Sequence, residues 1–337
     1  MPEIGQLDTA QWVLAAAMVG ATGLVSGLAT RTLIPMLRRR NLLDHPNERS
    51  SHVVPTARGG GIAPVGAVLL AWMALGLAGL APRPIIAIAL GTLLLAAVCW
   101  RDDLHGLSPA TRLAAQAGAV AIGLWAVPRN PLPHWIGPAA SLAAVGILWV
   151  WWLNLFNFMD GIDGLASSEA AAIGGGVLAV AALGSGVDPA AVLLGAAVLG
   201  AALGFLIWNW SPARVFLGDV GSAPLGYLTG FLLIVVAAGG RWMVALILPL
   251  YFLADATITL ARRLLRGERI WLAHRQHYYQ HAVGGGLSHA GVVKRVIATD
   301  ILLIGCAWAA ANGWGLAALA AAATIVAALL AILAFGR

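Results

Sequence analysis

The residues with the clearest chemical potential form a polar stretch at the end of a long apolar run, Asn154-Leu155-Phe156-Asn157-Phe158-Met159-Asp160-Gly161-Ile162-Asp163-Gly164. Amide and carboxylate side chains are costly beside hydrocarbon, so the stretch indicates a functional site; helix capping at a membrane exit is the plainer alternative. In one continuous helix, about nine residues at roughly 100° each would turn Asn154 and Asp163 to opposite sides. We therefore expect the helix to break near Gly161, because irregular backbone at membrane depth is tolerated where it lines a polar cavity.

Further carboxylates stand at the ends of other apolar segments. Asp102 and Asp103 are adjacent in the sequence, and adjacent carboxylates repel each other unless a cation or a basic group relieves the repulsion. Asp219 lies between Gly218 and Val220-Gly221, directly before an apolar segment, where it could offer its carboxylate to a metal ion with little steric obstruction. The plainer alternatives are a solvated acidic loop for the pair and helix capping for Asp219.

Basic and glycine-rich segments supply complementary groups. Arg58 precedes three glycines, whose backbone could approach a phosphate closely, although glycines also mark flexible turns. The tract His274-Arg275-Gln276-His277-Tyr278-Tyr279-Gln280 could bind phosphates or face an anionic membrane surface. Asp255, inside an apolar segment, is expected to face the bundle interior and to pair with a basic group. Together, these groups are what phosphate chemistry with a divalent cation requires.

The elements that must position these groups are transmembrane helices. The 337 residues are 60% hydrophobic and 10% charged, with a mean hydropathy of +0.86. This composition excludes an ordinary soluble domain, and the long unbroken apolar runs exclude a transmembrane barrel. We predict an all-α, polytopic integral membrane protein with ten or eleven spans and a single domain over residues 1–337. The candidate spans are 10–37, 60–80, 84–100, 111–128, 135–156, 165–183, 188–208, 219–238, 241–262, 291–311 and 314–335.

The distribution of basic residues predicts the orientation. Most Lys and Arg residues fall in or beside the loops that follow the odd-numbered spans, and the opposite loops hold Arg83, Arg129 and Arg241. Because cytoplasmic loops carry the excess of positive charge, we expect the N-terminus outside and the polar groups facing the cytoplasm, in the inner (cytoplasmic) membrane. The net charge of +6 then reflects these loops and suits anionic lipids or phosphorylated substrates, not nucleic acid.

Four motifs resemble, in order and spacing, the polyprenyl-phosphate N-acetylhexosamine-1-phosphate transferases of glycosyltransferase family 4, the superfamily that includes the phospho-MurNAc-pentapeptide translocases. The motifs are Asp102-Asp103, the stretch 157–164, Phe216-Leu217-Gly218-Asp219-Val220-Gly221-Ser222 and the histidine tract. Ser50-Ser51-His52-Val53-Val54-Pro55-Thr56, followed by Arg58 and the glycines, adds a resemblance to the enzymes that start O-antigen or related glycan synthesis. The translocases carry a run of histidines where this chain has Tyr279 and Gln280.

The resemblance implies transfer of a sugar 1-phosphate from a UDP-sugar to undecaprenyl phosphate, with release of UMP and a requirement for Mg²⁺ that Mn²⁺ could meet. It implies catalytic carboxylates at Asp102, Asp103, Asp160 and Asp163, and metal ligands at Asp219, Asp102 and Asp103. The residues assigned to substrate binding are Asn154, Asn157, Asn209, His52, Arg58, His274, Arg275 and His277. The expected partners are the UDP-sugar, undecaprenyl phosphate and membrane lipid, and a homodimer is compatible with the sequence.

Two other classes of function stay open at this point. A lipid-linked sugar flippase or ion-coupled transporter would more often place its polar residues near the bilayer midplane, on broken helices. Here most polar residues lie at the predicted cytoplasmic ends of the spans. A nonenzymatic membrane scaffold would need none of the carboxylates, so release of UMP distinguishes the transferase from both.

Overall fold

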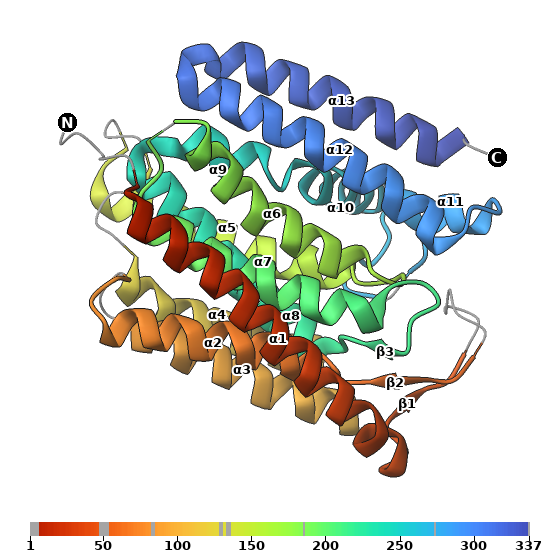
Figure 1. Cartoon of the computed structure of the whole chain (residues 1–337). Helices are drawn as coiled ribbons and strands as arrows, with labels where there is room; N and C mark the ends of the chain where they lie inside the picture. Colours follow the sequence, from red (N-terminus) through yellow and green to blue (C-terminus); the bar gives the residue numbers. More distant parts are fainter. Residues whose placement is uncertain are drawn as a thin grey trace.

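A computed structural model describes residues 7–46, 54–81, 85–127, 131–132, 136–184, 186–272 and 274–335. The long helices lie side by side in one bundle, with α12 and α13 along its top in Figure 1 and α2 and α3 along its bottom. The helices are α1 (Thr9–Arg39), α2 (Ile62–Leu77), α3 (Ile85–His105), α4 (Pro109–Gly123), α5 (Pro138–Phe158), α6 (Leu165–Ala182), α7 (Pro189–Asn209), α8 (Asp219–Val236), α9 (Trp242–Ile247), α10 (Leu250–Leu265), α11 (Tyr278–Gly284), α12 (His289–Ala309) and α13 (Gly315–Phe335).

The helices confirm the all-α, polytopic fold. In the described parts of the chain, seven stretches are long and apolar enough to cross a membrane, and α2 is a shorter apolar helix. The last stretch holds both α12 and α13, which reverse direction at Gly313, where φ is +96° (Figure 1). The predicted span 241–262 corresponds to α9 and α10, which are separated at Pro249, a residue that cannot donate a helical hydrogen bond. The orientation in the membrane stays a prediction.

Aromatic side chains join α5 to α8 and so place the ends of both helices together. The Trp149 indole donates to the Tyr227 carbonyl (2.9 Å), and the Trp152 indole donates to the Thr229 hydroxyl (3.1 Å). The Trp149 and Tyr227 rings also stack, with centroids 4.6 Å apart. A buried indole needs such a hydrogen-bond acceptor, and a stacked pair adds roughly 0.5–1.5 kcal/mol beyond its buried area. These contacts fix the C-terminal end of α5 beside the N-terminal end of α8.

A small sheet, which the sequence did not predict, lies at this end of the bundle. β1 (Leu43–Asp44) pairs antiparallel with β2 (Thr56–Arg58), and β2 pairs parallel with β3 (Val215–Phe216). The strands lead directly into α2 and α8, whose starts meet at Gly61 and Gly221. A Cβ atom on Gly61 would overlap the backbone of Gly221. The absence of side chains there brings the segment with Arg58 against the segment with Asp219.

Candidate active site

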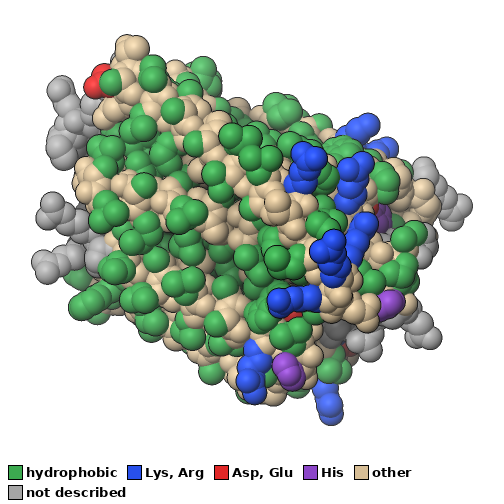
Figure 2. All heavy atoms as spheres, turned by 60° about the horizontal axis from the view of Figure 1, so that its bottom comes forward, with side chains coloured by type: hydrophobic (Ala, Val, Ile, Leu, Met, Phe, Trp, Pro, Cys, Tyr) green, Lys and Arg blue, Asp and Glu red, His purple; other side chains and the backbone are tan. Residues whose placement is uncertain are grey.

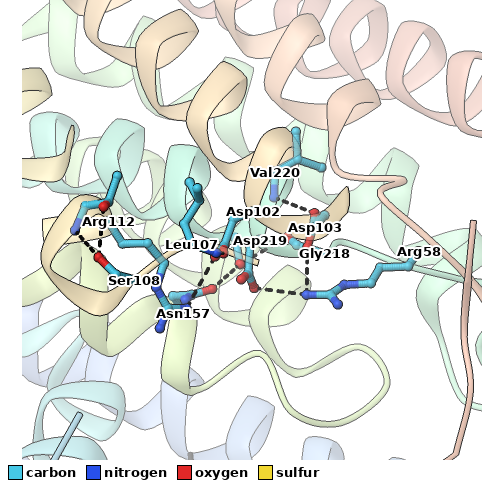
Figure 3. A network of polar contacts seen from close by, with 12 residues as sticks. Arg58, Asp102, Asp103, Leu107, Ser108, Arg112, Asn157, Gly218, Asp219 and Val220 are labelled. Atoms are coloured by element: carbon cyan, nitrogen blue, oxygen red, sulfur yellow. Dashed lines mark hydrogen bonds and ion pairs between the residues drawn. The ribbon is translucent and has the colours of Figure 1, made fainter. Parts of the chain in front are cut away.

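Four carboxylates gather at one end of the bundle, and we call Asp102, Asp103, Asp160 and Asp219 the acidic cluster. Arg58 lies between two of them: its Nη2 is 2.7 Å from Asp103 Oδ1 and 3.4 Å from Asp219 Oδ1 (Figure 3). The Asp103 carboxylate also accepts a hydrogen bond from the Val220 N–H at the start of α8 (3.3 Å). Burial tends to lower the pKa of Arg58, but the charges of Asp103 and Asp219 outweigh it, and the pKa is raised. Arg58 is therefore a permanent positive charge between the two carboxylates.

Asp102 points toward a different arginine from its neighbour. Its Oδ2 lies 3.3 Å from Arg112 Nη1 on α4, and its Oδ1 accepts a hydrogen bond from the Leu107 N–H (2.5 Å). Figure 3 shows Arg112 and Arg58 on opposite sides of the acidic residues. The repulsion expected between Asp102 and Asp103 is thus relieved by two separate arginines. Asp103, and not Asp102, shares the Arg58 guanidinium with Asp219.

The chain between α5 and α6 confirms the predicted helix break near Gly161. Helix α5 ends at Phe158, α6 begins at Leu165, and Gly164 between them has φ of +77°. We call residues Met159 to Gly164 the inter-helix loop. This left-handed conformation favours glycine, because a Cβ atom would strain it.

The break sends the polar side chains of this stretch in different directions. Asn157 accepts a hydrogen bond from the Ser222 hydroxyl of α8 (2.5 Å) and lies beside the acidic cluster (Figure 3). Burial and the charges of Asp219 and Asp103, opposed by that of Arg58, raise the pKa of Asp160 well above its usual value. The positive charge of Arg58 does not offset these effects, and a bound cation would add positive charge beside this carboxyl.

The other two members of the stretch have partners away from the cluster. Asn154 donates to Gln116 of α4 (2.7 Å) and to the Val150 carbonyl (2.8 Å). Asp163 Oδ2 lies 3.2 Å from His289 Nδ1 on α12 and accepts from the Ala213 N–H (3.2 Å). The four polar residues of the stretch therefore have different surroundings, and the roles predicted for Asn154 and Asp163 stay predictions. In this structure Asp160 belongs to the acidic cluster and Asn157 lies beside it, whereas Asn154 and Asp163 contact neighbouring elements.

Asn209 uses its side chain within the protein. It is buried at the end of α7, and its Oδ1 accepts from the Gly164 N–H (3.1 Å) and the Ser167 hydroxyl (2.8 Å). Its Nδ2 donates to the Val215 carbonyl of β3 (3.0 Å). The amide thereby joins the inter-helix loop to the strand that precedes Asp219. This arrangement gives Asn209 a structural role, and the substrate contact that the resemblance implied stays a prediction.

His277 is built into the fold through Asp255. The His277 and Asp255 side chains are 3% and 0% exposed, and their Nδ1 and Oδ1 atoms lie 3.1 Å apart. Asp255 also accepts from the Tyr278 N–H (3.1 Å) and the Tyr279 N–H (3.3 Å), so it caps the start of α11. The prediction that Asp255 faces the interior and pairs with a basic group is confirmed. His277 is buried in this pair, and its predicted contact with substrate stays a prediction.

The histidine tract nevertheless lies close to the inter-helix loop, since the Tyr279 hydroxyl donates to the Phe158 carbonyl (3.0 Å). His274 is half-buried, and burial, with the charges of His277 and Arg263, lowers its pKa to about 4. It is therefore neutral at neutral pH and would meet a ligand through hydrogen bonds instead of charge. Arg275 is exposed. His52 lies outside the described residues.

Charged side chains gather at one end of the molecule. Figure 2 shows Lys and Arg side chains over this end, whereas the rest of the visible surface carries many hydrophobic side chains and few charged ones. The pattern suits a protein whose apolar belt faces lipid and whose basic end faces the polar surface of one leaflet. The acidic cluster would therefore lie at the membrane boundary, within reach of a lipid phosphate and a water-soluble molecule.

The donor groups of the cluster fit a magnesium ion held partly by substrate. No three His, Cys, Asp or Glu side chains in the described ranges are arranged to hold a metal ion by themselves. Asp103 and Asp219 nevertheless converge on Arg58, and Asp103 Oδ1 makes no well-aligned hydrogen bond to any described group. Magnesium commonly binds one or two protein carboxylates together with substrate phosphates. Asp103 and Asp219 could supply the two protein carboxylates of such a site, whereas Asp102 is directed toward Arg112.

Three residues that the structure places in or beside the site were not predicted individually from the sequence. They are Arg112, which pairs with Asp102; Ser222, which bonds Asn157; and His289, which contacts Asp163. Ser222 is part of a motif that was identified as a whole, and Arg112 is one of many arginines predicted to face the cytoplasm, so neither was singled out. The contact of His289 with Asp163 could not be predicted, because His289 begins a helix 126 residues after Asp163 in the sequence.

Comparison with known proteins places the chain in a family. The family model described as glycosyl transferase family 4 matches residues 85–237. The chain is 32% identical over 329 residues to a phospho-N-acetylmuramoyl-pentapeptide-transferase of Synechococcus sp. (strain JA-2-3B'a(2-13)), covering 86% of this chain and 90% of the relative. It is 29% identical over 286 residues to a probable undecaprenyl-phosphate N-acetylglucosaminyl 1-phosphate transferase of Bacillus subtilis (strain 168), covering 79% and 77%. With its four motifs at one end of a helical bundle, the chain belongs to glycosyl transferase family 4.

Proposed function

We propose that this protein transfers an N-acetylhexosamine 1-phosphate from a UDP-sugar to undecaprenyl phosphate, and so starts an O-antigen or related cell-envelope polysaccharide. The observation that carries the proposal is the convergence of Asp103 and Asp219 on Arg58 at the basic end of a membrane bundle. A lipid phosphate and a cytosolic nucleotide meet at such a boundary. We place the site on the cytoplasmic face of the inner membrane, where UDP-sugars are available. The Bacillus subtilis relative, named for this class of reaction, supports the proposal.

The proposed reaction is a phosphoryl-type displacement that needs positioning more than proton removal. A phosphate oxygen of undecaprenyl phosphate attacks the phosphorus that carries the sugar, the bond from that phosphorus to the UMP oxygen breaks, and UMP leaves. A bound Mg²⁺, held by Asp103 and Asp219, would neutralise charge on the phosphate oxygens. Arg58 binds one phosphate group and keeps the reacting phosphates close. Because the lipid phosphate is already an anion, an in-line arrangement can replace a general base.

The remaining residues act on the substrates or on the residues that hold them. Asp160 in the cluster and Asn157 beside it would contact the nucleotide diphosphate or the metal. His274 and Arg275, in the tract that the Tyr279 hydroxyl holds against the end of α5, can reach the sugar or the diphosphate. Arg112 pairs with Asp102, so Asp103 is the member of the Asp102-Asp103 pair that would bind Mg²⁺ together with Asp219.

A second candidate is transfer of a phospho-MurNAc-pentapeptide from its UDP derivative. It is favoured by the Synechococcus relatives, which carry that name and match more than four fifths of this chain. Tyr279 and Gln280 favour the simpler sugar, since the tract lacks the histidine run that resemblance associates with the pentapeptide substrate. Tyr279 is buried, and its hydroxyl donates a hydrogen bond to the Phe158 carbonyl. The tyrosine at this position therefore also contributes to the fold of the tract.

The test is a transfer assay with purified protein in detergent, undecaprenyl phosphate, MgCl₂ and a panel of UDP-sugars that includes UDP-GlcNAc, UDP-GalNAc and UDP-MurNAc-pentapeptide. We expect UMP release and a lipid diphosphate sugar with an N-acetylhexosamine donor. Product from the pentapeptide donor alone would select the second candidate. If no donor yields UMP, the transferase proposal fails, and a transport assay in vesicles would then examine the flippase alternative. Omission of MgCl₂ provides the control for metal dependence.

A further inference from the structure

Asp163 joins three segments of the chain that are distant in sequence. It lies in the inter-helix loop, His289 is the first residue of α12, and Ala213 lies between α7 and β3. Asp163 Oδ2 is 3.2 Å from His289 Nδ1, and the Ala213 N–H donates to the same oxygen across 3.2 Å. The Asp163 backbone nitrogen is also 3.4 Å from His289 Nδ1. One carboxylate thus holds two loops and a helix together.

The surroundings of this contact favour a strong interaction. The Asp163 and His289 side chains are 9% and 12% exposed, so solvent competes little for their hydrogen bonds. Burial alone would raise the pKa of Asp163, but the hydrogen bond and charge of His289, with the Ala213 N–H, lower it below its usual value. Removal of His289 would leave this carboxylate buried with one fewer partner.

The helix that carries His289 does not need it for its own start. Ser288 is the N-cap of α12, and its hydroxyl oxygen accepts from the Gly291 N–H (3.0 Å). The side chain of His289 is therefore available to leave the helix axis and meet Asp163. This separation of tasks allows the two residues to be tested independently.

Both segments held by Asp163 continue into the acidic cluster. Asp160 lies three residues before Asp163 in the same loop, and the segment with Ala213 leads through β3 to Asp219. Asn209 holds the far end of the loop through the Gly164 N–H. A loosened Asp163 would let the loop shift relative to β3, which would change the separation of Asp160 and Asp219.

We propose that His289 is a positioning residue for the transfer site: by holding Asp163 it fixes the inter-helix loop against the segment that leads to Asp219. Asp163 then acts through its neighbours and contacts no reacting atom. This inference rests on the proposed function for its kinetic part, whereas the contact itself can be examined without turnover. Groups that orient residues holding a metal or substrate commonly contribute about 10- to 100-fold to activity.

The experiment compares His289→Ala, His289→Gln and Ser288→Ala in the full chain. We expect His289→Ala to lower kcat about 10- to 100-fold with a smaller change in KM for the UDP-sugar, and His289→Gln to recover part of the loss, because an amide N–H can donate to Asp163. Ser288→Ala, which removes the cap of the same helix, should leave kcat within about twofold, since a cap contributes to helix stability and not to the site. Equal kcat losses in His289→Ala and Ser288→Ala would overturn the proposal.

Hydrogen exchange followed by mass spectrometry gives the readout that does not depend on turnover. In His289→Ala, exchange should rise in peptides that contain the inter-helix loop and Ala213, and stay unchanged in α13. Unchanged exchange in those peptides would refute the contact. The double variant His289→Ala/Asp163→Ala should have a kcat no lower than that of Asp163→Ala, because Asp163→Ala already removes the contact with His289. Independent, multiplicative losses would contradict it. If the parent protein transfers no sugar phosphate, the proposed function fails, and the exchange result still decides the contact.

Discussion

The acidic cluster and the histidine tract differ in how their polar groups are satisfied. In the cluster, Asp103 and Asp102 pair with Arg58 and Arg112, whose side chains are 37% and 38% exposed. In the tract, the His277 and Asp255 side chains are almost completely buried and bond each other. Charges held by exposed arginines can exchange partners when a ligand arrives, whereas a buried pair is part of the scaffold. The polar residues of these two motifs therefore differ in how firmly their partners are fixed.

The largest effect that would sharpen this contrast is expected at Asp255. Asp255→Ala removes the acceptor of His277 and of two N–H groups of α11. Loss of one partner of a buried pair commonly costs about 3–5 kcal/mol, so the variant should unfold at markedly lower temperature. Thermal unfolding in detergent measures this. Asp255→Asn, which keeps the shape but not the charge, should be affected less, and an unchanged melting temperature in Asp255→Ala would remove the contrast.

The next effect is catalytic and leaves the fold intact. Asp219→Asn replaces a charged oxygen ligand by an amide, and we expect about 10²- to 10³-fold loss of UMP release, as for other charge-stabilising groups in active sites. Thermal unfolding should change little, because Asp219 is one of several carboxylates sharing two arginines. Asp8→Asn, a helix-capping change far from the cluster, is the control, since Asn caps as well as Asp. Full activity in Asp219→Asn would exclude Asp219 from the metal role.

A smaller effect is expected at Asn209, which belongs to the scaffold although it stands beside the site. Asn209→Ala leaves the Gly164 N–H and the Val215 carbonyl without their partner. Each unsatisfied buried group costs about 1–3 kcal/mol, so the loss of two partners should lower the free energy of unfolding by about 2 kcal/mol or more. Asn312→Ala removes an exposed hydrogen bond to the Trp308 carbonyl and serves as the matched control. A loss of activity without loss of stability would instead favour direct substrate contact.

The smallest effect concerns His274 and the pH. The pKa of His274 is lowered from 6.5 to about 4 in the folded protein. As pH falls through 6.5, the unfolded chain binds a proton that the folded protein does not, so stability falls between pH 6.5 and about 4. His274→Gln should show a shallower loss of melting temperature over that interval. Identical pH profiles for parent and variant would show that His274 is not shielded as the structure indicates.

Sequence reasoning predicted features that depend on local geometry. The helix break near Gly161 followed from the rotation of a helix by roughly 100° per residue. The interior position of Asp255 followed from the cost of a carboxylate in an apolar segment. These predictions needed no knowledge of which helices are neighbours.

The rest depends on long-range pairing that one sequence does not specify. Arg58 meets Asp219 because β2 pairs with β3 and Gly61 packs on Gly221, and strands of two or three residues carry too little pattern to predict their register. His289 meets Asp163 through the placement of α12. The partner of Asp255 was predicted as a basic group, but its identity as His277 required the turn before α11.

The pairing of β2 with β3 also has a consequence for biosynthesis. Ribosomes deliver the chain from its N-terminus, so β2 waits with one open edge while α2 to α7 are made. Arg58 gains its carboxylate partner on α8 only after Asp219 has emerged. Assembly of the site is thus a late event, and a chain truncated before β3 would expose an unpaired strand edge that quality-control proteases and chaperones can recognise.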